Sequence, residues 1–164
     1  MMIIMEQLSI DVIDIELLRL LQRDASLTNQ ALAKLVHISP PTCLRRIKRM
    51  RLAGVIESQL AFLNPEKIRT IAGRMLTAIV EVTLDRQDAA TWEQFEKKAV
   101  AESMVQQCYR VSPGPDFILI IHAAQMVDYL ELTQRLFTSN TNVRNVKAFF
   151  SIKRSKFGAE LPLG

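Results

Sequence analysis

Cysteine and histidine are scarce in this sequence, with two residues of each. Cys43 and Cys108 are too few and too far apart for a disulfide framework or a thiolate metal site, and lone thiols suit a reducing compartment. His37 and His122 are also far apart, and there is no glycine-rich phosphate loop, HExxH motif or nucleophile elbow. We therefore predict that the protein is not an enzyme and has no catalytic residue, metal site or cofactor.

Long hydrophobic runs are missing as well. No apolar stretch approaches the roughly 18 residues that a membrane helix needs, and the opening "MMIIMEQ" has neither the basic start nor the apolar length of a signal peptide. With 49% hydrophobic and 23% charged residues, the composition is that of an ordinary globular protein. We expect a folded cytoplasmic protein of one domain or two small domains, with no membrane partner.

Acidic residues are absent from residues 39–56, "SPPTCLRRIKRMRLAGVI", which contain five Lys or Arg. Residues 1–38, by contrast, hold three Lys or Arg and five Asp or Glu, a net charge of 3 − 5 = −2. The net charge of the whole chain, +4, is too small to indicate a nucleic-acid partner by itself. A basic run is also commonly no more than the solvated face of a helix, so the neighbouring elements must decide.

Three helices are predicted in this first third of the chain. Apolar spacing and capping residues indicate one helix starting at Asp11, a short second helix capped by Thr28 and a third capped by Ser39. Pro40 and Pro41 then occupy the first two positions of the third helix, where a missing N–H removes no helical hydrogen bond. The two prolines therefore start this helix and do not interrupt it.

The third helix is predicted to be amphipathic. On a helical wheel, the inner arc holds Cys43, Leu44, Ile47 and Met50, and the outer arc holds Thr42, Arg45, Arg46, Lys48 and Arg49. Of the basic residues, only Arg51 falls on the apolar side. Two short helices joined by a tight turn, the second basic on its free face, are typical of a helix-turn-helix whose recognition helix enters the DNA major groove. The predicted DNA-binding residues are Ser39, Pro41, Thr42, Arg45, Arg46, Lys48 and Arg49.

The position of each residue along the recognition helix predicts what it contacts. Residues near the amino end of such a helix reach base edges, which favours Pro41, Thr42, Arg45 and Arg46 for base contacts. The remaining cations, Lys48 and Arg49, are better placed for phosphates.

The pattern changes after Gly54, which is a helix stop. Residues 55–63 are a strand candidate, and the "NP" at residues 64–65 indicates a turn that breaks the chain. From residue 75 the periodicity gives the order β-α-β-β-α-β, the ferredoxin-like arrangement of an antiparallel sheet with both helices on one face. The fold class expected is therefore α+β.

One strand of this region, "FILII", has no polar residue on either side and should be central, with both faces covered. The predicted fold supplies helices for only one face. A second subunit covering the other face, and hence a homodimer, is one explanation, and a further layer of the same chain is the other.

The segments "IDVIDIELLRLLQRD", "LAKLVHIS", "RRIKRMRLAGVIES" and "VSPGPDFIL" together resemble the leucine-responsive regulator (Lrp/AsnC, or feast/famine) family over residues 10–153. The resemblance implies a winged-type helix-turn-helix domain at 1–54, a linker strand and hinge at 55–73, and a ferredoxin-like domain for effector binding and oligomerisation at 74–164. It also implies homodimers that assemble into octamers or similar rings, and an effector that is commonly an amino acid.

The effector site of this family lies near the turn that corresponds to residues 111–116 here, so the resemblance makes Ser112, Gly114 and Asp116 the candidate effector-binding residues. Pro113 stands where glycine is usual, and it lacks an N–H and fixes φ, which would alter a pocket that uses either property. A rigid hairpin with no ligand remains an equal alternative. Asp116 would receive an effector's amino group or accept N–H groups of the turn.

These expectations together describe a transcriptional regulator that binds double-stranded DNA and is modulated by a small molecule, such as an amino acid. The alternative is an architectural DNA-binding protein of the same assembly that ignores small molecules. A ferredoxin-like regulatory module of a metabolic enzyme is a third class, but it leaves the basic helix unexplained.

Overall fold

The computed structural model describes residues 9–73, 75–140 and 142–163, with Glu66, Arg69 and Ala72 described by their backbone alone. Residues 1–8, 74, 141 and 164 of the predicted domains therefore lie outside the described residues. No helix within the described ranges is both long and apolar enough to cross a membrane.

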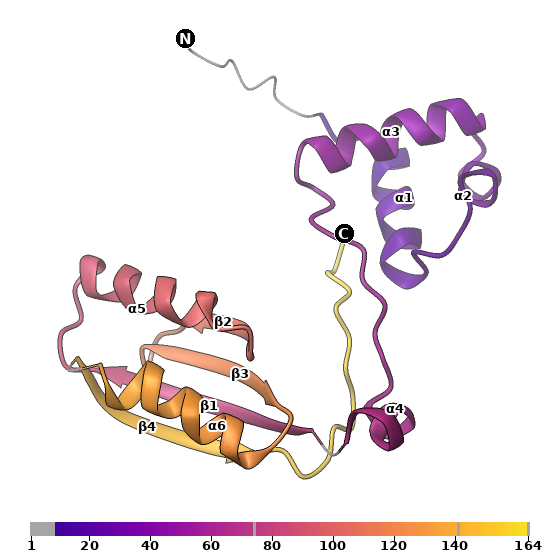
Figure 1. Ribbon diagram of the computed structural model, residues 1–164. Helices are drawn as coiled ribbons and strands as arrows, with labels where there is room; N and C mark the ends of the chain where they lie inside the picture. The colour runs from indigo at the N-terminus through magenta and orange to yellow at the C-terminus, as the bar shows by residue number, and fades with distance from the viewer. Residues whose placement is uncertain (1–8, 74, 141, 164) are drawn as a thin grey trace. The chain divides into compact units, whose positions relative to one another are not determined.

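The described residues form two compact units, each with a core of its own (Figure 1). The first unit comprises the chain up to Phe62 together with the segment that begins at Lys156. The second unit extends from Leu63 to Ser155. The sequence-based division assigns everything after residue 73 to one C-terminal domain. In the structure, residues 156–163 instead pack with the first unit.

The first unit consists of three helices whose starts are set by side-chain caps. The helices are α1 (Val12–Arg23), α2 (Asn29–Leu35) and α3 (Pro40–Leu52). As predicted, Thr28 and Ser39 are N-caps and prolines fill the first two positions of α3. Asp11, expected either to cap α1 or to favour its positive end, is the N-cap of α1, and all three caps accept a backbone N–H of the first turn. His37, between α2 and α3, has a left-handed φ of 54°, and Gly54 stops α3 with a φ of 72°.

The core of the first unit is a narrow apolar cluster. From α3 it takes Cys43, Ile47 and Met50, one residue per turn, packed against Leu17 of α1 and Leu32 of α2. The sequence-based placement of Leu44 in this core is wrong, since its side chain is 57% exposed. The inward-facing stripe is narrower than the arc drawn on the helical wheel.

The expected strand at residues 55–63 is not formed, because a strand needs a partner backbone and no described segment pairs with it as a ladder. The expected turn after Asn64 is instead the start of a helix, α4 (Pro65–Ala72). Proline at the first helical position favours this start for the same reason as in α3, and the Asn64 side chain accepts the Lys67 N–H at 3.3 Å.

The second unit has the predicted β-α-β-β-α-β order. Its four strands form an antiparallel sheet in the order β2-β3-β1-β4, and two helices pack on one face (Figure 1). The second helix continues into a π-helical turn, η1. The elements are β1 (Leu76–Leu84), α5 (Ala89–Ala101), β2 (Val105–Arg110), β3 (Phe117–Ala123), α6 (Met126–Thr133), η1 (Gln134–Thr138) and β4 (Val143–Phe150).

Alternation along the strands separates a buried face from an open one. On β1, Val80 and Val82 are fully buried under the helices, whereas Ile79 points to the other face and is 41% exposed. Ile79 is paired with Phe149 of β4, which is 53% exposed. As predicted, β3 is a central strand, but its second face is not covered by any other described segment of this unit.

Candidate nucleic-acid interface and ligand-binding unit

The outer face of α3 is exposed along its length. Pro41, Arg45 and Lys48 all point to solvent, at helical positions that lie over one another. Among the described residues, Arg45 and Lys48 form no ion pair and no side-chain hydrogen bond. Their charges are therefore available to an external anion.

Ser39 and Thr42 lie at the amino end of the same helix and contact one another. Their hydroxyl oxygens are 2.8 Å apart, and the Ser39 oxygen also accepts the Thr42 N–H at 3.4 Å. Ser39 is exposed and Thr42 is half-buried. The Thr42 hydroxyl is thus held in place by the cap at the end of α3 that groove geometry favours for base contacts.

The other two candidate arginines, Arg46 and Arg49, turn toward α1 and bind its carboxylates. Arg46 Nη1 is 2.7 Å from Asp11 Oδ2 and 3.0 Å from Asp14 Oδ1, and Arg49 Nη2 binds Asp14 Oδ2. The Asp14 side chain is completely buried. These hydrogen bonds raise the pKa of Arg46, and the Asp14 N–H and then Arg46 lower the pKa of Asp11.

This arrangement connects the core of the unit to its surface. A buried carboxylate is strongly destabilising unless it is paired and hydrogen-bonded, and here two guanidinium groups supply both needs. Arg46 and Arg49 therefore stabilise the seating of α3 on α1. The sequence offered one signal of this, a carboxylate at position 14 three residues before the buried Leu17 on the apolar stripe of α1.

The three candidate effector residues are not brought together. Ser112 and Gly114 are exposed on the turn between β2 and β3, and Gly114 has a φ of 124°. The Asp116 side chain points inward and is buried. It accepts hydrogen bonds from the Leu84 N–H at 2.7 Å, Gln87 Nε2 at 3.1 Å and Trp92 Nε1 at 3.0 Å.

Asp116 therefore fastens the β2–β3 turn to the end of β1 and the start of α5. The sequence predicts that Asp116 either receives an effector's amino group or accepts N–H groups of the turn. In the structure it accepts N–H groups, but the donors belong to β1, to Gln87 and to α5 and not to the turn. Trp92, whose indole N–H donates to this carboxylate, was not among the predicted site residues.

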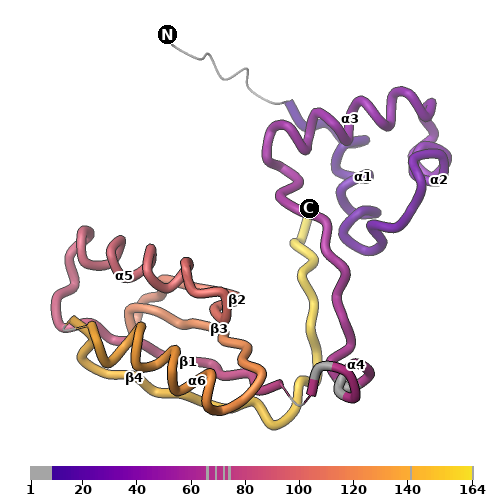
Figure 2. The backbone as a smooth tube through the Cα atoms, in the orientation of Figure 1, coloured from indigo at the N-terminus to yellow at the C-terminus, as the bar shows by residue number. Residues whose placement is uncertain are grey.

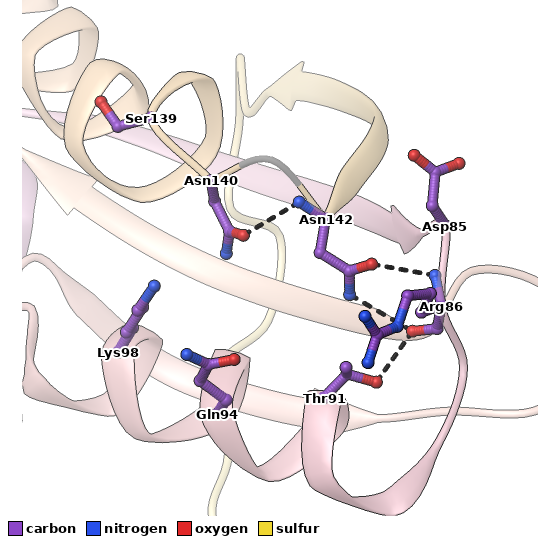
Figure 3. Close-up of a pocket in the computed structure, with 8 residues that line it drawn as sticks. All are labelled: Asp85, Arg86, Thr91, Gln94, Lys98, Ser139, Asn140 and Asn142. Atoms are coloured by element: carbon purple, nitrogen blue, oxygen red, sulfur yellow. Dashed lines mark hydrogen bonds between the residues drawn. The ribbon is translucent and has the colours of Figure 1, made fainter.

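A polar hollow of about 460 Å³ lies between α5 and the segment that joins η1 to β4 (Figure 3). Gln94 and Lys98 project from α5 toward Ser139 and Asn140 across the hollow. Its lining residues are Asp85, Arg86, Thr91, Gln94, Lys98, Ser139, Asn140 and Asn142.

Charge and hydrogen-bonding capacity in this hollow are uneven. Asn142 and Thr91 are already bonded to the backbone of Arg86. Lys98 and Gln94, in contrast, have no hydrogen bond or ion pair among the described residues, so the hollow offers one ammonium and one amide to a bound molecule. Sequence reasoning missed these residues because no motif marks them and the chain segments are distant.

Other chemistry is not assembled in the described ranges, where no three His, Cys, Asp or Glu side chains come together as a metal site. Burial raises the pKa of both thiols, Cys43 and Cys108, so neither is an activated nucleophile. Burial and the nearby Arg154 lower the pKa of His122.

Comparison with known families matches both units. Residues 10–57 match the family described as winged helix-turn-helix DNA-binding, and residues 77–161 match the Lrp/AsnC ligand binding domain. The two matches correspond to the helical unit and to the sheet-containing unit, with the second continuing into residues 156–161.

Curated relatives are similar over most of the chain. A leucine-responsive regulatory protein of Haemophilus influenzae is 38% identical over 124 residues, covering 76% of this chain and 72% of that protein. An uncharacterised HTH-type transcriptional regulator of the same organism is 33% identical and covers 90% of this chain and 86% of its own.

Solved structures agree in fold. An AsnC family transcriptional regulator from Agrobacterium tumefaciens has a TM-score of 0.78 at 29% identity, covering 93% of this chain and 97% of its own. A transcriptional regulator from Neisseria meningitidis, solved as a complex with L-Met, has a TM-score of 0.77 at 27% identity, covering 94% and 97%. The relatives are transcriptional regulators and not enzymes. This chain belongs to the Lrp/AsnC family of DNA-binding transcriptional regulators and carries that family's ligand-binding domain.

Proposed function

We propose that this regulator binds specific DNA sequences through the outer face of α3 and changes that binding in response to an amino acid. The observation that carries the DNA half of the proposal is the pair of unpartnered cations, Arg45 and Lys48, on an exposed helix face. Arg46 and Arg49 are paired with Asp14, so they hold α3 against α1 and contribute less to the charge that faces DNA.

Arg45 lies within two turns of the amino end of α3 and is assigned to a base edge, where a guanidinium can bond guanine in a bidentate manner. Lys48, one turn further along, is assigned to a phosphate. Thr42, positioned by Ser39, and Pro41 complete the surface at the entry end of the helix.

The test begins with DNA selected from a random-sequence pool, followed by fluorescence anisotropy titrations with selected and unrelated duplexes at several salt concentrations. Arg45→Ala should lose about 1–3 kcal/mol of discrimination between the two duplexes. Lys48→Ala should weaken binding to both and lower the slope of log affinity against log salt by about 1. Lys97→Ala, which removes an exposed cation from α5, is the charge-matched control. Equal losses in all three variants would refute the assignment.

An amino-acid effector is supported by two observations. One relative was solved with L-Met bound. In this chain, the hollow beside α5 presents the ammonium of Lys98 and the amide of Gln94, groups that suit the carboxylate shared by all amino acids. The exposed turn carrying Ser112 and Gly114 is the second candidate location, with Asp116 holding that turn in place.

Thermal unfolding against the twenty amino acids identifies the effector, because a ligand at about 100 times its Kd stabilises the folded protein by about 2.7 kcal/mol. Lys98→Ala should abolish the shift if the effector occupies the hollow, and Ser112→Ala should abolish it if the turn is the site. Both side chains are exposed, so we expect both variants to fold, and a lost shift would report lost binding. No shift with any amino acid, together with intact specific DNA binding, would favour the architectural alternative.

The open face of the sheet supports a homodimer. Ile79 and Phe149 lie side by side on it, and Tyr109 of the edge strand β2 is 52% exposed beside Ile118. Apolar surface of this kind suits an isologous contact with a second copy. Octamers or similar rings would require further contacts, and sedimentation velocity at several concentrations distinguishes these states.

A further inference from the structure

The last described residues, 156–163, form a tail that packs with the DNA-binding unit and not with the ligand-binding unit that precedes it in the chain. The tail runs beside residues 55–62, as the backbone trace shows (Figure 2). The DNA-binding unit is therefore connected to the ligand-binding unit at two points of the chain, after residue 62 and before residue 156.

The side chain of Gln22 on α1 makes two hydrogen bonds to the tail. Gln22 Oε1 accepts the Leu161 N–H at 2.6 Å, and Gln22 Nε2 donates to the Leu161 carbonyl at 3.3 Å. One amide side chain thus satisfies both backbone groups of one tail residue, as a neighbouring strand would. Such a contact fixes the position of the tail along α1 without depending on the Leu161 side chain.

Three further contacts lie on either side of this pair. Arg19, one turn earlier on α1, donates to the Leu163 carbonyl from Nε at 3.2 Å and from Nη2 at 2.9 Å. Arg23 Nε lies 3.9 Å from Glu160 Oε2. The rings of Phe157 and Phe62 meet edge to face with centroids 5.1 Å apart. The contacts follow the tail in order, so they describe one continuous docked segment.

The docking face of α1 differs from the face that holds α3. Arg19, Gln22 and Arg23 bind the tail, while Asp14 and the buried Leu17 face α3 and the core. Loss of the tail would therefore leave the Asp14 pairing and the outer face of α3 in place.

From this geometry we propose that the outer face of α1 is a docking site for the chain's own residues 156–163, and that the docked tail is a second tether restricting the DNA-binding unit. A unit held by one flexible connection samples many orientations, and a second attachment removes much of that freedom. In a dimer that reads two half-sites, this restriction selects the half-site spacing. The spacing consequence rests on the proposed function, whereas the docking does not.

The docking is tested by hydrogen exchange in the chain of 164 residues, without DNA or effector. Gln22→Ala removes both hydrogen bonds to Leu161, and we expect the Leu161 amide to exchange about tenfold faster and trypsin to cut after Lys156 more readily. Gln30→Ala, the same substitution at an exposed position of α2, is the control and should change neither. A Leu161 amide that is unprotected in the wild type, or equally protected in Gln22→Ala, overturns the docking.

The tether is tested with operators in which the two half-sites are moved apart by half a helical turn. The wild type should bind the altered operator at least about tenfold more weakly than the original, and Gln22→Ala, or a chain ending at Ser155, should lose most of that penalty. An unchanged penalty in chains whose tail is shown to be undocked overturns the tether. Failure of all proteins to prefer any DNA refutes the proposed function and the spacing consequence, while the exchange result still decides the docking.

Discussion

Replacing Asp14 with asparagine should destabilise the DNA-binding unit more than replacing either of the arginines that bind it, Arg46 or Arg49. The carboxylate is completely buried and binds both Arg46 and Arg49. Removing one partner of a buried ion pair costs about 3–5 kcal/mol, but these arginines are 21% and 43% exposed and can turn to water, which lowers the cost. We expect a loss of about 2–3 kcal/mol, or roughly 8–24 °C in the Tm of a unit this small.

Circular dichroism of helix melting and hydrogen exchange of α3 amides measure this loss. Asp11→Asn is the matched control, because asparagine caps a helix about as well as aspartate and the Asp11 side chain is 49% exposed. Its effect should be much smaller. In the Asp14→Asn background, Arg49→Ala should add little, because the contact it removes is already lost. A loss below about 0.5 kcal/mol for Asp14→Asn, or full additivity with Arg49→Ala, would refute the pairing as a source of stability.

The ligand-binding unit offers three further predictions. Asp116→Asn should cost about 1–3 kcal/mol, seen as a lower urea midpoint when unfolding is followed by Trp92 fluorescence, because its three donors lose a charged acceptor. Burial and Arg154 lower the His122 pKa below 6.5, so the unfolded state protonates first and stability should fall as pH drops through 6.5. That fall should shrink in His122→Gln. Phe149→Lys on the open sheet face should shift sedimentation from dimer to monomer.

Each of these has a clear contrary result. An unchanged urea midpoint would mean that the Asp116 contacts add nothing to stability. A pH dependence identical in the wild type and His122→Gln would assign the titration to another group. A Phe149→Lys dimer as stable as the wild type would place the subunit contact on another surface.

Local signals in the sequence predicted most of the fold. The capping residues Thr28 and Ser39, the prolines that start α3 and the period change at residue 75 each depend on near neighbours in the chain, and all were confirmed. The helix α4 was missed because proline after asparagine was interpreted as a break, although the same residue type starts α3.

Contacts between distant residues could not be predicted in this way. The pairing of Asp14 with Arg49 spans 35 positions and that of Asp116 with Leu84 spans 32, so neither leaves a local pattern. The tail contacts with α1 span 137 positions or more. A count of basic residues drew attention to α3, but it could not tell which of its arginines bind the buried Asp14 and which face outward.

The position of the tail matters for how the protein is handled. Residues 156–163 are not an outlying extension of the ligand-binding unit, because Leu161 and Leu163 are held by α1 of the DNA-binding unit. An affinity tag or fluorescent fusion attached there would be held beside α1 and would compete for Gln22 and Arg19. Operator preferences measured on such a fusion would then describe a DNA-binding unit with a loosened attachment, and cleaving the fusion before the titration would restore the native one.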